Sequence, residues 1–110
     1  MPAVKILDRK EMLPEGDVMK AIAWKIPESK DFPEGIKYAF AYIHKDKRIF
    51  GYDNERVKGH HKHFVDIKTG VEREEKILFT DIATLFRQFN NKIIILRKKL
   101  YGGKDESKKS

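Results

Sequence analysis

A single helical stripe of apolar residues, confined to the last part of the chain, limits the folds that this sequence can adopt. Across residues 80–101 the large apolar side chains recur every three or four positions, at Ile82, Leu85, Phe86, Phe89, Ile93, Leu96 and Leu100. This spacing places them on one face of an α-helix. Thr80 and Asp81 suit the amino-terminal cap and the positive end of the helix dipole, and Gly102-Gly103 suits the end of the helix. We therefore expect one long C-terminal helix with a face that must be buried.

Before residue 80, apolar and polar residues alternate with the period of two that is typical of β-strands. The alternation predicts strands at residues 4–13, 18–26, 36–44, 48–53 and 60–67, with turns or loops at 14–17, 27–35, 45–47 and 54–59. Residues 71–78 fit either a charged edge strand or a loop. The large side chains of residues 18–26 share one parity, so we expect Trp24 to join Tyr38 and Phe40 in the core.

These elements combine into an α+β fold, in which an antiparallel sheet of about five strands carries the long C-terminal helix across one face. With 110 residues the chain fits one domain, which we expect at residues 1–103, followed by a disordered basic tail at residues 104–110. The absence of cysteine excludes disulfides and thiolate metal ligands. The sequence shows neither a signal peptide nor an apolar run of about 18 residues. We expect a cytoplasmic protein without a membrane partner.

The titratable side chains gather at residues 53–63, which hold three of the four histidines. If this part is extended, His61 and His63 point to one face of the strand, and His60 and Lys62 point to the other. Imidazoles two positions apart, about 7 Å along a strand, can share a phosphate or a metal ion. They can also act as general acid and base in phosphodiester cleavage. Solvated side chains at an exposed strand end would show the same spacing.

The net charge of +7 favours an anionic partner, either a nucleic acid or an acidic protein. The candidate contacts to nucleic acid are Tyr52, Asn54, Arg56, Lys58 and Lys62. Two of them have a structural alternative, because Asn54 can bond to nearby backbone amides and Tyr52 can pack as a half-buried strand residue. A metal site would use His61 and His63 with Asp53 or Glu55 as a third ligand. The hypothesis that we favour needs no metal and no cofactor.

Several segments taken together resemble the TumE family over residues 4–100. They are Ala23-Trp24-Lys25-Ile26-Pro27, Lys37-Tyr38, Gly51-Tyr52-Asp53-Asn54-Glu55 and Lys58-Gly59-His60-His61-Lys62-His63. Proteins of that family are classed as toxins of toxin–antitoxin pairs whose partner is a helix-turn-helix antitoxin. The resemblance therefore implies a growth-inhibiting toxin of type II. The family commonly has an acid where this chain has His60, so no role of a carboxylate is carried over to that position.

Our leading hypothesis is a toxin that acts on RNA, by analogy with other small basic toxins. In it, His61 and His63 serve as acid and base, Asp53 orients an imidazole, and Lys58 and Lys62 contact phosphate. Three alternatives stay open: a non-enzymatic module that binds nucleic acid, a metalloprotein, and a protein-interaction module without chemistry. A homodimer through the charged edge at residues 71–78 is a further open question.

Overall fold

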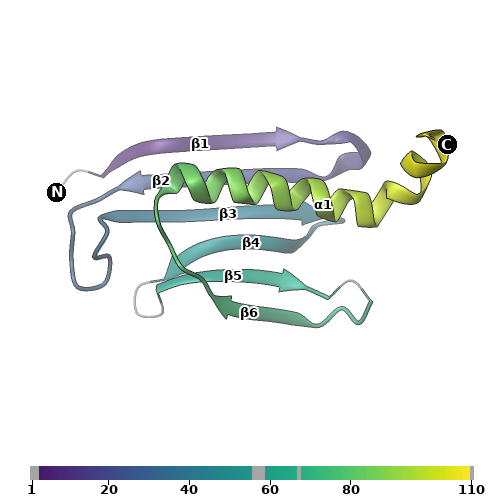
Figure 1. Ribbon diagram of the computed structural model, residues 1–110. Coiled ribbons are helices and arrows are strands. Elements are labelled where there is room, and N and C mark those ends of the chain that lie inside the picture. Colours follow the sequence, from purple (N-terminus) through teal and green to yellow (C-terminus); the bar gives the residue numbers. More distant parts are fainter. Residues whose placement is uncertain (1–2, 56–58, 67, 110) are drawn as a thin grey trace.

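The computed structural model describes residues 3–55, 59–66 and 68–109, the side chains of residues 55 and 103–109 excepted, as an α+β fold (Figure 1). Its strands are β1 (Val4–Met12), β2 (Val18–Lys25), β3 (Ile36–His44), β4 (Lys47–Glu55), β5 (Gly59–Val65) and β6 (Glu72–Lys76). They form one antiparallel sheet in the order of the sequence. The predicted fold class is confirmed, with six strands where about five were expected, because residues 72–76 pair with β5 as an edge strand.

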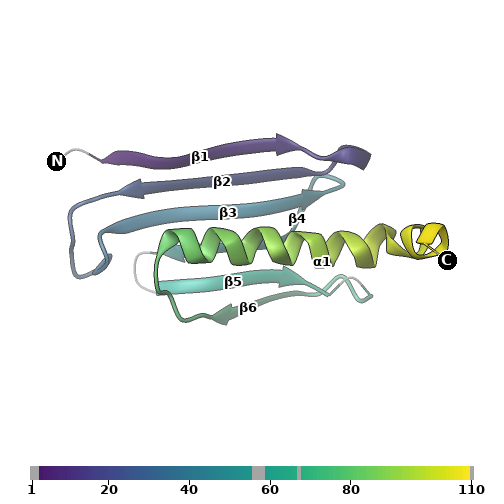
Figure 2. The same ribbon diagram turned by 45° about the horizontal axis from the view of Figure 1, so that its top comes forward.

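One helix, α1 (Ile82–Lys109), lies along one face of this sheet, and its C-terminal part extends past the strands (Figures 1 and 2). We call the covered side the helix face and the opposite side the far face. The core between α1 and the sheet contains Met19, Ala21, Ala23, Tyr38, Phe40, Tyr42, Ile49, Phe50, Tyr52, Leu85, Phe89, Ile93 and Leu96. Phe89 is at its centre, with its ring centroid 5.3 Å from that of Phe40 and 6.2 Å from that of Phe50.

The predicted burial of Trp24 in this core is wrong, because β2 turns its small side chains toward the helix. Ala21 and Ala23 are buried, whereas Trp24 lies on the far face, partly exposed, with Lys5 Nζ 5.1 Å from the centre of its ring. The strand register gives the reason. Ala23 pairs with Tyr38 and Ala21 with Phe40. The small residues of β2 leave room for the large rings of β3 under the helix, and a second row of large side chains would overfill the same layer.

Both ends of the helix differ from the expectation. Asp81, not Thr80, caps the first turn: its Oδ1 accepts a hydrogen bond from the backbone N–H of Thr84 at 2.7 Å, and its Oδ2 accepts one from the Thr84 hydroxyl at 3.1 Å. The predicted stop at Gly102-Gly103 is also wrong, because α1 continues to Lys109. Gly102 does not take the positive φ by which a glycine usually ends a helix. The domain boundary at residue 103 and the tail at 104–110 stay predictions.

The loop that connects β4 to β5 is shorter than expected. We predicted a loop at residues 54–59, but Asn54 and Glu55 still belong to β4, and Gly59 already begins β5. Residues 56–58 lie outside the description. The outer edge of this half of the sheet is β6, whose five residues are all charged and exposed. Charges along an edge strand discourage pairing with another chain, so a homodimer through this edge stays an untested prediction.

Candidate functional site

The pairing of β4 with β5 divides the predicted site between the two faces of the sheet. Asp53 pairs with His61, and Tyr52 pairs with Lys62. Because side chains alternate along a strand, Asp53, His61 and His63 come together on the far face. The neighbouring residues of the motif, which are Tyr52, Asn54, His60 and Lys62, point to the helix face. The sheet therefore separates the expected acid–base residues from the expected nucleic-acid contacts.

His63 lies between two carboxylates. Its Nε2 is 2.9 Å from Asp53 Oδ1, and its Nδ1 is 3.5 Å from Glu74 Oε1 on the neighbouring strand β6. Ionised carboxylates only accept hydrogen bonds, so the ring can satisfy both partners only when both of its nitrogens carry a proton. The contact with Glu74 is long for a hydrogen bond, which leaves Nδ1 accessible to another acceptor.

His61 is held in a different way. Its Nδ1 is 3.0 Å from the carbonyl oxygen of Gly59, and the residue is only 5% exposed. A carbonyl oxygen cannot donate, so Nδ1 carries the proton, and Nε2 of the neutral ring is left as an acceptor. The ring centroids of His61 and His63 are 6.4 Å apart. The far face thus holds two neighbouring imidazoles with different hydrogen-bond partners, a backbone carbonyl for His61 and two carboxylates for His63.

Two charged residues of this site were not recognised in the sequence. Arg48 Nη1 lies 3.8 Å from Asp53 Oδ2, and Glu74 reaches His63 as described. Gly51, between Arg48 and Asp53 in β4, is required by the close approach of β3, because a Cβ there would lie 2.3 Å from the Phe40 carbonyl oxygen. Neither contact leaves a signal in the sequence, since each depends on strand register. We call Arg48, Asp53, His61, His63 and Glu74 the histidine cluster.

Two of the predicted nucleic-acid contacts are part of the interior. Tyr52 is 9% exposed and packs edge-on against Phe50 and Phe89, and its burial raises the pKa of its hydroxyl. Asn54 is 5% exposed. Its Nδ2 donates to the Ile36 carbonyl at 2.6 Å, and its Oδ1 accepts from the backbone N–H of Tyr38 at 3.0 Å. The alternative in which Asn54 bonds to backbone groups is therefore the observed one.

The remaining predicted contacts lie near the surface or outside the described residues. Lys62 is partly buried on the helix face, with its Nζ 3.2 Å from Glu75 Oε1 and 5.1 Å from the centre of the Phe64 ring. Arg56 and Lys58 lie outside the residues that the structure describes. Their proposed contacts with phosphate stay predictions.

His60 belongs to the packing of the helix face. Its ring stacks on Phe79 with a centroid distance of 4.3 Å, and its Nδ1 lies 2.8 Å from the Tyr38 hydroxyl. Its Nε2 is 3.1 Å from Glu34 Oε1. Desolvation by burial, with the nearby carboxylates of Asp53 and Glu34, raises the pKa of Tyr38, so this hydroxyl stays a donor to the imidazole. With both ring nitrogens and one ring face in contact, His60 stabilises the fold at the start of β5.

The metal alternative finds no geometric support. Among the side chains described for residues 3–54, 59–66 and 68–102, no group of three or more His, Cys, Asp or Glu is arranged to hold a metal ion. Asp53 already binds His63 through Oδ1. Glu55, the other third ligand considered, has no described side chain.

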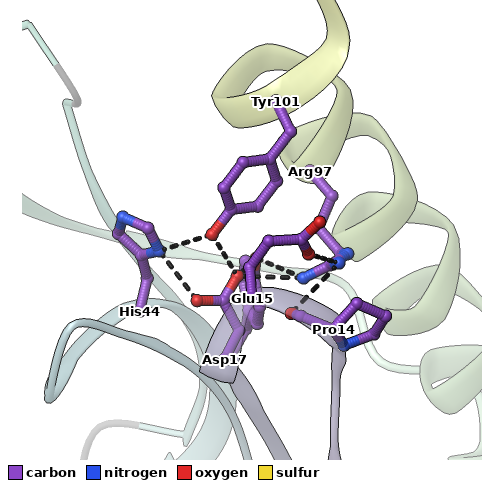
Figure 3. A network of polar contacts seen from close by, with 7 residues as sticks. Pro14, Glu15, Asp17, His44, Arg97 and Tyr101 are labelled. Carbon is purple, nitrogen blue, oxygen red and sulfur yellow. Dashed lines mark hydrogen bonds and ion pairs between the residues drawn. The ribbon is translucent and has the colours of Figure 1, made fainter. Parts of the chain in front are cut away.

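A second polar cluster, centred on Asp17, joins α1 to the start of β2 and the end of β3 (Figure 3). Asp17 is 1% exposed and lies 2.6 Å from the Tyr42 hydroxyl, 2.8 Å from His44 Nδ1, and 2.9 Å from both Arg97 Nη1 and the Tyr101 hydroxyl. Burial alone would raise the pKa of this carboxyl, but hydrogen bonds from Tyr42, His44 and Tyr101 outweigh it and hold the pKa below its usual value. We call these five residues the Asp17 hub.

The hub was missed in the sequence, where Asp17 was predicted only as part of the turn at residues 14–17. Arg97 also bonds to Glu15 and, at 3.4 Å, to the Pro14 carbonyl oxygen. Among the described residues, a hollow beside the hub is lined by three carboxylates, those of Glu15, Asp17 and Asp46, and by one lysine. This balance disfavours an anionic ligand, so the contacts of the hub point to the attachment of the helix rather than to a binding site.

Fold and site together define a small α+β protein with a histidine–carboxylate cluster on the uncovered face of its sheet. A family model described as toxin TumE matches residues 8–97. The chain belongs to this toxin family, which confirms the resemblance found in its motif. No curated protein and no solved structure matches the chain. In the part of the chain that the structure describes, no helix combines the length and the apolar character that crossing a membrane requires.

Proposed function

We propose that this chain is a toxin that cleaves RNA in the cytoplasm by metal-independent acid–base catalysis at His61 and His63. The observation that carries the proposal is the different hydrogen bonding of the two imidazoles. A carbonyl partner leaves His61 Nε2 as an acceptor, whereas the two carboxylates beside His63 can each accept a hydrogen bond from its ring. Cleavage of a phosphodiester without a metal uses a general base and a general acid, and these two rings have their centroids 6.4 Å apart.

The reaction follows from these positions. His61 Nε2 removes the proton of a ribose 2′-hydroxyl, and the 2′-oxygen then forms a bond to the adjacent phosphorus. The bond from phosphorus to the 5′-oxygen breaks, and His63 Nδ1 donates its proton to that leaving oxygen. Asp53 holds the His63 ring through Nε2, as a positioning residue. The guanidinium of Arg48, 44% exposed beside Asp53, can stabilise the charge that develops on the phosphate.

An RNA-cleaving toxin must be restrained in the cell that makes it. Family membership supports an antitoxin as the partner, and the resemblance described above implies that this partner is a helix-turn-helix protein. We propose a type II arrangement, in which the antitoxin binds the toxin as a protein. Co-purification of the chain with the product of an adjacent gene would support this part of the proposal.

The experiment compares cleavage of total RNA by the purified chain and by a His61→Ala/His63→Ala variant, with and without EDTA. We expect cleavage by the wild type that resists EDTA, and a rate lower by about 10²–10⁴-fold for each histidine removed. The matched control is His60→Phe, which removes the neighbouring imidazole from the helix face and keeps an aromatic ring on Phe79. This control should cleave RNA normally.

Three outcomes would contradict the proposal. Cleavage that EDTA abolishes would assign the chemistry to a metal ion. Absence of cleavage by the wild type would leave a toxin with another target or a non-enzymatic module. Undiminished growth inhibition by the double variant, with circular dichroism showing an intact fold, would separate toxicity from the histidines.

A further inference from the structure

A groove of about 460 Å³ lies on the helix face, between α1 and the second half of the sheet. Four lysines line it, Lys62 from β5, Lys68 from the turn after β5, and Lys92 and Lys99 from α1. Its apolar lining includes Phe64 and Leu96. Its volume is within the range of about 300–1,000 Å³ that is usual for ligand sites. We call it the lysine groove.

The groove carries a clear excess of positive charge. Among the lining residues that the structure describes, the one acidic residue is Asp66, whose Oδ1 accepts hydrogen bonds from the backbone of Lys68 and Thr69 in the turn. Lys62 pairs with Glu75, whereas the structure shows no carboxylate partner for Lys92 or Lys99 among the residues it describes. Lys68, Lys92 and Lys99 thus remain to bind an anionic ligand.

The histidine cluster lacks such an excess. The hollow beside His63 is lined by two arginines, Arg48 and Arg73, and by two glutamates, Glu72 and Glu74. These charges balance, and Asp53 adds one more carboxylate next to them. An RNA chain therefore needs a source of binding energy outside the cluster, and the lysine groove supplies the charge that the cluster does not.

We propose that the lysine groove binds single-stranded RNA, an inference that rests on the function proposed above. Its lysines contact successive phosphates, and a base stacks on Phe64. The groove and the hollow beside His63 share Phe64 and Val65 in their linings, at the end of β5. A strand held in the groove can thus pass around this end of the sheet to reach the histidines. A duplex is too stiff for that turn, which is why the ligand is a single strand.

The test measures binding apart from cleavage, by fluorescence anisotropy with a labelled single-stranded RNA oligonucleotide and the His61→Ala/His63→Ala protein. Adding Lys92→Ala and Lys99→Ala should weaken binding roughly tenfold or more, and should lower the slope of log K against log salt by about 1.4 for two lost phosphate contacts. The matched control adds Arg87→Ala and Lys98→Ala, which remove the same charge from exposed positions of the same helix away from the groove. Binding of the control should stay within about twofold.

Equal losses in the two variants would overturn the groove and leave unspecific attraction by net charge. Duplex RNA bound as tightly as the single strand would overturn the choice of ligand. Displacement of RNA by polyglutamate at equal or lower concentration would assign the groove to an acidic protein segment instead. Groove-dependent binding of RNA that the wild type never cleaves would uphold the groove and reject the ribonuclease, so the two proposals fail separately.

Discussion

Asp53 and Asn54 are neighbours in β4 and have different tasks, because the strand turns them to opposite faces. The Asp53 carboxylate contacts His63 on the far face, which α1 does not cover. The Asn54 amide hydrogen-bonds to two backbone groups of β3, the Ile36 carbonyl and the Tyr38 N–H, and is buried. Substitutions at the two positions should therefore separate catalysis from stability.

Replacement of Asp53 by Asn should slow RNA cleavage by roughly 10–100-fold, because the carboxylate that orients the His63 ring is lost while its shape is kept. Single-turnover cleavage of a labelled RNA at saturating protein measures this rate. Urea unfolding should show little change in the free energy of unfolding, since the Asp53 side chain is partly exposed. A variant that cleaves at the wild-type rate would show that Asp53 does not position the imidazole.

The matched control at this scale is Asn54→Ala. It leaves the Tyr38 N–H and the Ile36 carbonyl without their partner, which should lower the free energy of unfolding by about 1–3 kcal/mol. The rate of cleavage by the protein that remains folded should not change. Reduced cleavage without reduced stability would mean that Asn54 serves the site rather than the strand.

At the scale of elements, the attachment of α1 depends on the Asp17 hub as well as on the apolar stripe. Removal of one partner of a buried ion pair leaves the other charge poorly compensated, so Asp17→Ala should lower the free energy of unfolding by about 3–5 kcal/mol. Urea unfolding followed by circular dichroism measures the change. The matched control is Asp8→Ala, which breaks an exposed ion pair with Lys5 and should cost less than about 1 kcal/mol. Equal effects of the two substitutions would show that the hub does not hold the helix.

The same elements show what sequence patterns can and cannot predict. Periodicity located the helix and strands well, because the period is set by backbone geometry and by one buried face. It did not decide which face of β2 is buried. That choice depends on the rings that β3 places opposite Ala21 and Ala23, which only the register reveals. The helix end predicted at Gly102 was wrong for a similar reason, since a glycine allows a helix to end but does not require it.

The candidate site could be predicted from the sequence only where its residues lie close together in the chain. The spacing of His61 and His63 placed them together on one face because alternation along a strand requires it. Their partners Arg48 and Glu74 come from other parts of the sheet, and the lysine groove combines β5, a turn and α1. Contacts such as that between Asp17 and Arg97 join residues 80 positions apart and have no signature in a single sequence.

For the molecule as a whole, the hub predicts how stability depends on pH. In the folded protein, hydrogen bonds from Tyr42, His44 and Tyr101 hold the pKa of the Asp17 carboxyl below its usual value, and the bonds to Thr84 lower the pKa of the Asp81 carboxyl in the same way. The unfolded chain therefore binds more protons in acid. The stabilisation is complete above the unfolded pKa and is lost as the pH falls below about 4 through the folded pKa.

Urea unfolding at pH 5 and pH 3 should thus show a marked loss of stability in acid. An Asp17→Asn variant, less stable at pH 5, should lose less between the two values, because it has no carboxyl to protonate at this position. A variant with the same loss as the wild type would place the acid sensitivity elsewhere in the chain.

The sheet is assembled from strands that pair in the order of the sequence, and the helix that covers it is the last element of that order. During synthesis, each strand therefore finds its neighbour already made, whereas the rings of Tyr38, Phe40 and Phe50 have no cover until α1 emerges. A nascent or truncated chain that stops before α1 presents an uncovered aromatic surface, which favours aggregation or capture by chaperones. The groove proposed to bind RNA also lacks one wall at that stage, since Lys92 and Lys99 belong to α1. Binding of RNA in the proposed groove would then require that α1 has been made and has docked onto the sheet.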